Sequence, residues 1–219
     1  MEWTKQKKEI VRALLRRLKA RTKKSAPTLL MRRELQHLLT QGEQQVIREL
    51  GRTYPSQYGF GGPYYGTKEP NPAQLVQVPP SFSEGRQYVH ALVAKDLSRM
   101  IQAMRKELGR GVVVISAYRS PSYQALLFLE FLIGYNFNMR RTCRRVAIPG
   151  WSEHGAAKNQ AVDFDVDVKA GKQRPSFGTT KEYRWLKLHA HQFNFYLSYP
   201  RGNPHGVQFE PWHWHWEKR

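Results

Sequence analysis

The sequence predicts an α+β fold, and three observations support this. Apolar residues follow helical spacing over residues 86–108 and in the segment that begins at Pro121. Residues 161–168, "AVDFDVDV", alternate strictly between acidic and apolar side chains, which is typical of a half-buried strand. Helices and strands are mixed without the βαβ rhythm of a parallel sheet and without an internal repeat. With 219 residues, of which 40% are hydrophobic, the chain is expected to form one large domain, or one domain with an appendage.

The first 50 residues are basic and helical in pattern, with 13 Lys and Arg against 5 Asp and Glu. Ile10, Val11, Leu14, Leu15 and Leu18 share one helical face. A second helix is expected after an N-cap at Thr28, and a third helix over residues 43–50. Two interpretations stay open: an appendage with a solvated basic face, or a module that binds cell wall, membrane or nucleic acid.

Residues 54–72 are rich in Gly, Pro and Tyr and predict an irregular linker or a long surface loop. Expected strands are "VVVIS" at 112–116, the alternating 161–168, "FYLSYP" at 195–200 and the C-terminal "VQFEPWHWHW". A further helix is expected over residues 182–193. We therefore predict a basic helical extension with linker over residues 1–75 and a second domain over 76–219.

The net charge of +19 and the sequence pI of about 10.3 predict a polyanionic partner, either nucleic acid or the anionic bacterial envelope. The single cysteine, Cys143, excludes an internal disulfide and a Cys-rich zinc ribbon, and is expected to be a small buried side chain. No stretch approaches the ~20 apolar residues of a membrane span. The basic N-terminus lacks the apolar run of a secretory signal. Localisation therefore stays open. Either the chain is not exported by the secretory route, or a signal lies outside this sequence.

The segment "EPWHWHW" at 210–216 indicates one wall of a metal site or an aromatic strand. A catalytic zinc needs three protein ligands, usually His with Asp or Glu, and an open position. His154 in a loop and Asp163 at the start of a strand could supply two of them, and His213 the third. Glu210 is the candidate general base. It and His213 would face opposite sides of a regular strand, but a bend at Pro211 could turn Glu210 toward the same side.

Arg119 follows the expected strand 112–116, where a guanidinium could hold a substrate carboxylate or stabilise an oxyanion. Ser152, two residues before His154, could add a hydrogen bond. Ordinary interpretations also exist: "DFDVD" as a polar strand face and "WHWHW" as an aromatic strand. Spacing alone leaves both interpretations open.

Four motifs in order, "SAYRSPSYQ", "VAIPGWSEH", "AVDF" and "EPWHW", resemble those of the VanY-type zinc D,D-carboxypeptidases, within the wider group of D-Ala-D-Ala peptidases and phage L-Ala-D-Glu endolysins. The likeness covers roughly residues 86–217. It implies a central, mostly antiparallel sheet flanked by helices, as in the hedgehog signalling domain, and hydrolysis of a peptide bond in peptidoglycan stems. It also implies one Zn²⁺ per chain held by His154, Asp163 and His213, with Glu210 as base and Arg119 binding substrate and oxyanion. The substrate-pocket positions that it implies are Ser116, Gln124 and Ser152.

The sequence departs from the family pattern in the metal loop. The family usually spaces the first His and the Asp seven residues apart, whereas here the gap is nine, and Ala157 stands at a usual glycine. A spacing of seven would fall on Ala161, which cannot bind metal. Asp163 keeps the "AVD" context and is the predicted ligand, with Asp165 as the fallback. The additional His215 is expected to have a second-shell or solvent role.

The predicted function is hydrolysis of peptidoglycan stem peptides by a D-alanyl-D-alanine carboxypeptidase. An L-Ala-D-Glu endopeptidase of the phage type is the alternative, because the basic N-terminal segment and the missing signal would suit a lysin. A non-catalytic basic protein that binds wall or nucleic acid is the alternative from another class. The expected partners are peptidoglycan stem peptides and, through the basic surface, an anionic cell-wall polymer.

Overall fold

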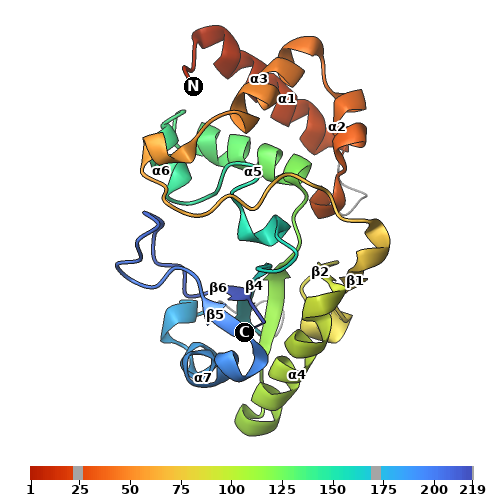
Figure 1. Cartoon of the computed structure of the whole chain (residues 1–219), viewed down its shortest axis with the longest axis vertical. Coiled ribbons are helices and arrows are strands. Elements are labelled where there is room, and N and C mark those ends of the chain that lie inside the picture. The colour runs from red at the N-terminus through yellow and green to blue at the C-terminus, as the bar shows by residue number, and fades with distance from the viewer. Residues whose placement is uncertain (22–26, 169–173, 219) are drawn as a thin grey trace. The chain divides into compact units, whose positions relative to one another are not determined.

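The computed structural model of the chain describes residues 1–21, 27–168 and 174–218 (Figure 1). Helices are combined with antiparallel sheets, so the predicted α+β class is confirmed. The chain forms two compact units, each built from separate stretches of sequence. The first unit contains residues 1–69, 119–155 and 203–208, and the second contains residues 70–118, 156–202 and 209–219. The predicted division into residues 1–75 and 76–219 stays a prediction.

The first unit is helical. Its α-helices are α1 (Lys5–Arg21), α2 (Arg32–Leu38), α3 (Gln41–Gly51), α5 (Pro121–Gly134) and α6 (Met139–Cys143). The apolar face predicted for α1 is buried, with Val11 and Leu14 fully inaccessible to solvent. This face packs in one hydrophobic core with residues of α3 and α5, including Leu50 and Phe128. The N-terminal helices therefore share a core with α5, which begins 70 residues after α3 ends.

Capping residues explain where these helices begin. Thr40 caps α3 and forms a capping box with Glu43, and Ser120 caps α5 ahead of Pro121 at the first helical position. The predicted cap at Thr28 is wrong, because α2 begins at Arg32 and its N-cap is Met31. Residues 27–29 form a 3-10 turn instead, and the carbonyl oxygen of Thr28 accepts a hydrogen bond of 2.8 Å from the Ser120 amide.

Among its described residues, the second unit contains two antiparallel sheets and two α-helices. Its elements are β1 (Leu75–Gln77), β2 (Tyr88–His90), α4 (Ala91–Leu108), β3 (Val112–Ser116), β4 (Ala161–Val166), α7 (Lys181–His189), β5 (Phe195–Leu197) and β6 (His213–Trp216). Strands β1 and β2 pair with each other, and the larger sheet has the order β3-β4-β6-β5. The last strand in sequence, β6, therefore lies inside the sheet beside β4.

Several predicted boundaries differ from the structure: β4 ends at Val166 and not at residue 168, and β5 ends at Leu197 and not at residue 200. The helix expected from residue 86 begins at Ala91, because Tyr88–His90 pairs with β1 as a strand. The helix expected over 182–193 is α-helical only to His189 and continues as a 3-10 turn to Phe193. The C-terminal strand begins at His213 and not at Val207, because residues 211–212 form a turn. The strand at 112–116 is confirmed.

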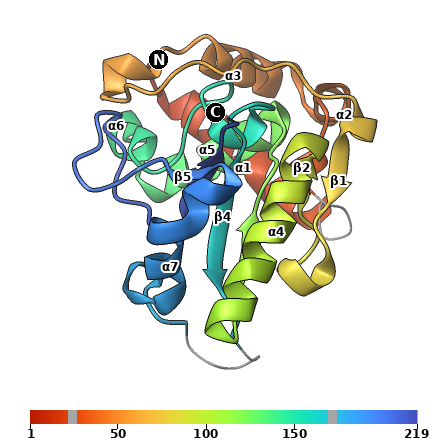
Figure 2. The ribbon, with the colours of Figure 1, turned by 60° about the horizontal axis from the view of Figure 1, so that its bottom comes forward.

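The two faces of the larger sheet differ in chemistry. Val114, Val162 and Phe164 point into a hydrophobic core to which α4 and α7 contribute, and Figure 2 shows the sheet with both helices. Alternate residues of β4, Asp163 and Asp165, point to the opposite face, as the alternating pattern predicts. Within the described part of the chain, no helix combines the length and apolar character that a bilayer crossing requires.

Candidate metal centre

Strands β4 and β6 place a carboxylate directly opposite an imidazole. Asp163 and His213 are paired across the two antiparallel strands. The Asp163 Oδ1 atom lies 2.9 Å from His213 Nδ1, and both side chains are buried. Directly opposite residues on one sheet face have Cβ atoms about 5 Å apart, so the strand register alone brings these two groups together.

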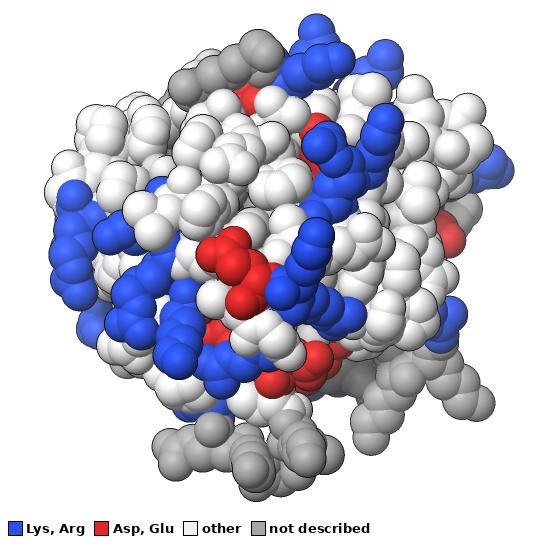
Figure 3. Space-filling model, turned by 90° about the horizontal axis from the view of Figure 1, so that it is seen from below, with Lys and Arg blue, Asp and Glu red and all other residues white. Residues whose placement is uncertain are grey.

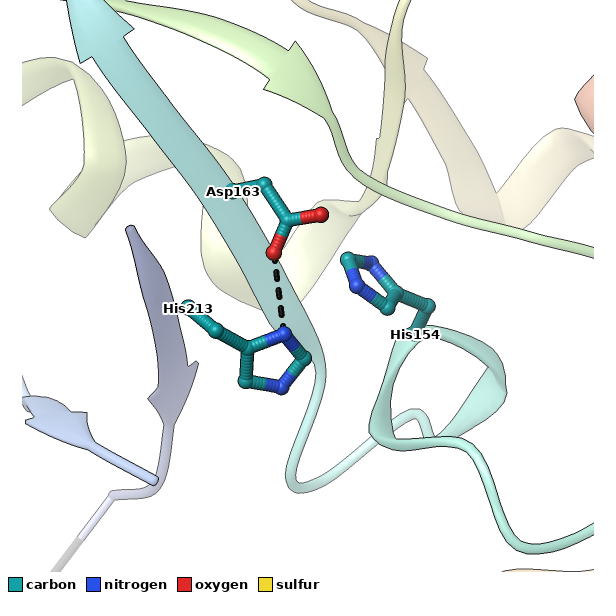
Figure 4. A group of neighbouring side chains, drawn as sticks. All are labelled: His154, Asp163 and His213. Carbon is teal, nitrogen blue, oxygen red and sulfur yellow. Dashed lines mark hydrogen bonds and ion pairs between the residues drawn. The ribbon is translucent and has the colours of Figure 1, made fainter. Parts of the chain in front are cut away.

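His154 completes a group of three ligand-type side chains (Figure 4). It lies in the short 3-10 turn Glu153–Gly155 and is 1% exposed. One potential ligand atom from each of His154, Asp163 and His213 lies within 4.8 Å of the other two. Two imidazoles and one carboxylate are a donor set that catalytic zinc sites use, and three ligands leave one coordination position open. The donor chemistry therefore fits the predicted ion.

The turn at Pro211–Trp212 brings Glu210 to the same centre. The His213 amide donates to the Glu210 carbonyl at 3.1 Å, which closes a four-residue turn with proline at its second position. Glu210 Oε2 lies 3.9 Å from His213 Nδ1, and the side chain is 7% exposed. The bend predicted at Pro211 is confirmed, and it directs the carboxylate toward His213.

Tyr199 supports His213 in a way that was missing from the sequence interpretation. Its ring lies 4.8 Å from the imidazole at an interplanar angle of 36°, and it is buried. The Tyr199 carbonyl accepts a hydrogen bond of 3.1 Å from the Glu210 amide. The only sequence signal was its position at the end of the expected strand "FYLSYP". Tyr199, in the segment that follows β5, thus contacts both the His213 ring and the backbone of Glu210.

The tryptophans of the C-terminal motif lie on the core side of β6. Trp214 and Trp216 are 3% and 4% exposed and belong to the hydrophobic core, while Trp212 packs against it. The indole nitrogen of Trp214 donates to the Pro211 carbonyl at 2.9 Å, which ties the turn to the strand. Alternation along the strand therefore separates the buried tryptophans from His213.

The other predicted site residues lie on β3, on α5 and in two loops. Ser116 ends β3 and is paired with Asp163 across the sheet, so it lies beside the carboxylate ligand candidate. Arg119 is half-buried, and its amide donates to the His154 carbonyl at 3.2 Å. Ser152 is buried, and its carbonyl accepts from the Gly155 amide. Gln124 is also buried, and its Nε2 donates to the carbonyl of residue 147 at 2.7 Å.

Asp165 and His215 have other partners. Asp165 Oδ2 lies 3.2 Å from the Arg174 guanidinium, and its Oδ1 accepts from the amide of the next residue. The Nδ1 atom of His215 lies 2.8 Å from the Ser198 hydroxyl. Neither belongs to the group formed by His154, Asp163 and His213 among the described residues. The longer spacing after His154 is accommodated by a bend at residues 157–159 before β4.

The model of the VanY family, D-alanyl-D-alanine carboxypeptidase, matches residues 86–219, which is more than half of the chain. The chain belongs to the VanY family. This match confirms the resemblance seen in the four motifs.

Two curated relatives support the assignment to the VanY family. YodJ of Bacillus subtilis (strain 168), which is grouped with the carboxypeptidases, is 29% identical over 161 residues, or 72% of this chain. A D-alanyl-D-alanine carboxypeptidase of Enterococcus faecium is 27% identical over 129 residues, or 58% of this chain. The matched regions are only 56% and 36% of the lengths of these two relatives.

Solved structures of VanY-type enzymes share the fold. The LD-carboxypeptidase LdcB is 27% identical with a TM-score of 0.58, and the match covers 74% of this chain and 77% of LdcB. A variant of the D,D-pentapeptidase VanY in complex with Zn(II) is 25% identical with a TM-score of 0.55, and covers 71% of this chain and 87% of that one. VanYB in complex with D-alanine-D-alanine gives the same identity and TM-score, with coverage of 71% and 86%.

Proposed function

We propose that this chain is a zinc-dependent peptidase that removes the C-terminal D-alanine from peptidoglycan stem peptides. The observation that carries the proposal is the group of His154, Asp163 and His213, with the Glu210 carboxylate 3.9 Å from His213. Membership of the VanY family supports a carboxypeptidase. The Zn(II) complex and the D-alanine-D-alanine complex of its structural relatives support the metal and the substrate class.

The chain's own residues divide the chemistry between them. His154, Asp163 and His213 would hold the zinc ion, which supplies Lewis acidity that polarises a peptide carbonyl and makes water easier to deprotonate. Glu210 takes a proton from the attacking water and passes it to the leaving amine, so that peptide and water become a carboxylic acid and an amine. Because Glu210 is buried beside an imidazole, bulk water does not compete for hydrogen bonds to its carboxylate.

Arg119 supplies the positive charge that this reaction needs. A guanidinium can bind a terminal carboxylate through two parallel hydrogen bonds, or stabilise the negative charge that develops on the carbonyl oxygen. Ser116, paired with Asp163, and Ser152, two residues before His154, are proposed to line the substrate pocket. Gln124 is proposed to act there by holding the segment that leads to His154.

Product analysis tests the function. Purified protein loaded with zinc is incubated with a stem pentapeptide, a stem tetrapeptide and purified peptidoglycan, and the products are identified by mass spectrometry. Loss of one D-alanine from the pentapeptide is the expected result. Release of D-alanine from the tetrapeptide alone would indicate L,D-specificity, as in LdcB, and cleavage between L-Ala and D-Glu would indicate the endopeptidase. No cleavage by protein containing one zinc per chain would refute a peptidase.

We further propose that a basic surface of the first unit holds an anionic cell-wall polymer. Lys8 and Arg12 of α1 lie over the ring of Phe137 at 5.6 and 5.1 Å, and the exposed Arg140 and Arg141 follow it on α6. None of these four cations has an ion pair with a described residue. Figure 3 views the chain from below, a different side on which further Lys and Arg side chains are exposed beside a group of Asp and Glu.

Co-sedimentation tests this partner. Binding to intact cell walls should exceed binding to walls stripped of teichoic acid, and should weaken as the salt concentration rises. Replacing the four cations by serine should remove the difference between the two wall preparations. Equal sedimentation with both preparations, together with salt-sensitive DNA binding, would instead favour nucleic acid as the polyanion.

A further inference from the structure

The Gly- and Tyr-rich segment interpreted from the sequence as a linker binds the loop that carries His154. We call residues 60–66 the Tyr65 segment and residues 147–155 the His154 loop. The amides of Tyr65 and Gly66 both donate to the carbonyl oxygen of Gly150, at 2.8 and 3.1 Å. Both stretches belong to the first unit. The Tyr65 segment therefore has a fixed place against this loop although most of it has no regular secondary structure.

Aromatic packing reinforces these hydrogen bonds. Trp151 of the His154 loop contacts Phe60 and Tyr64 of the Tyr65 segment, with ring centroids 6.3 and 5.1 Å apart and edge-to-face geometry. Phe60 is 3% exposed. Edge-to-face pairs contribute about 0.5–1.5 kcal/mol each beyond area burial. Two aromatic rings thus contact Trp151, which lies three residues before His154.

Gly150 allows this close approach. Its φ of +88° lies in the left-handed region, which side chains other than glycine rarely adopt. A Cβ atom at this position would stand 2.5 Å from Cε2 of Tyr64. The sequence "PGW" therefore places a glycine where the Tyr65 and Gly66 amides bind this loop.

One hydrogen bond reaches the neighbour of the metal ligand candidate. The Tyr65 hydroxyl donates to Glu153 Oε1 at 3.1 Å. Glu153 is 8% exposed and precedes His154 in the same 3-10 turn. Fixing the Glu153 side chain restrains the peptide from which His154 projects. From the other side, the amide of Arg119 donates to the His154 carbonyl.

We propose that Tyr65 is a positioning residue for the metal centre, acting through Glu153 on His154. Residues beyond the ligands fix ligand orientation before the metal binds, and their loss typically lowers metal affinity 10- to 100-fold. The Tyr65 segment then helps to hold a metal ligand in position. This inference rests on the proposed zinc site and adds to it a residue that lies before the matched family region at 86–219.

A double-mutant cycle on zinc affinity tests the proposal. The zinc Kd of the full chain is measured by chelator competition for wild type, Tyr65→Phe, Glu153→Gln and the double variant. Tyr65→Phe removes only the hydroxyl, and Tyr54→Phe, at a tyrosine that is 65% exposed, is the matched control. We expect the zinc Kd to rise about tenfold in Tyr65→Phe and to stay unchanged in Tyr54→Phe. The zinc Kd of the double variant should be no higher than that of the more affected single variant, because the two residues act through one contact.

A spectrum separates positioning from a purely structural role. In the Co²⁺-substituted protein, Tyr65→Phe should change the visible absorption bands, which report ligand geometry, whereas Tyr54→Phe should not. An unchanged spectrum with unchanged affinity, or additive effects of Tyr65→Phe and Glu153→Gln, would overturn the role of Tyr65. A wild-type protein that binds no zinc would instead overturn the metal site itself, so the two failures are distinguishable.

Discussion

Replacing Glu210 by glutamine is the sharpest test of the proposed chemistry. Glutamine has nearly the same shape, so the turn closed between the Glu210 carbonyl and the His213 amide should persist. The substitution removes the negative charge and the ability to accept a proton. Glu210 is not one of the three grouped ligand candidates, so the variant should still bind zinc.

The expected loss follows from the role of the carboxylate. A positioned general base contributes about 10²- to 10⁴-fold to the rate, which is about 2.7–5.4 kcal/mol at about 1.36 kcal/mol per factor of ten. The Glu210 carboxylate lies 3.9 Å from Nδ1 of the ligand candidate His213, and its negative charge should also favour a cation bound there. Loss of the charge is therefore expected to weaken cation binding as well, and kcat must be compared at saturating zinc.

The assay is D-alanine release from a stem pentapeptide at saturating zinc, with metal content measured on the same samples. Asp165→Asn is the matched control, because Asp165 lies on the same face of β4 but pairs with Arg174. We expect Glu210→Gln to lose at least about 100-fold in kcat and the control to retain wild-type activity. Wild-type turnover by Glu210→Gln with one zinc per chain would show that another group accepts the proton.

Three further predictions concern the ligands and two buried groups. Asp163→Ala should abolish stoichiometric zinc binding while Asp165→Ala retains it, measured by atomic absorption; the reverse result would make Asp165 the ligand. Burial raises the pKa of the Cys143 thiol to about 12, so it should resist maleimide at pH 8 in the native protein and react in urea; rapid native labelling would contradict its burial. Burial lowers the pKa of His90 below its ordinary 6.5. Just below pH 6.5 the unfolded chain therefore binds a proton at His90 that the folded chain does not. Its contribution to stability is present above pH 6.5 and is lost as the pH falls below that value. His90→Leu should therefore flatten the decrease in unfolding free energy between pH 7 and 5 in urea titrations, and an unchanged slope would refute this.

Local patterns in the sequence predicted much of the fold. Strict alternation predicted β4, and the buried run "VVVIS" predicted β3 with its observed bounds. Predictions failed where a distant segment decided the outcome. Tyr88–His90 is a strand because β1 pairs with it, and Thr28 lies in a 3-10 turn whose carbonyl binds the distant Ser120 amide. Periodicity reports only on neighbours a few residues away, and neither partner lies that close.

By itself, the sequence determined which side chains could bind a metal and where proline would bend the last strand, because donor chemistry and proline geometry are properties of single residues. The tertiary structure decided that Asp163, and not Asp165, lies opposite His213, because strand register joins residues 50 positions apart. It also placed Tyr199 against His213 and Tyr65 against Glu153. Such contacts depend on how separate elements pack, and no spacing along the chain encodes them.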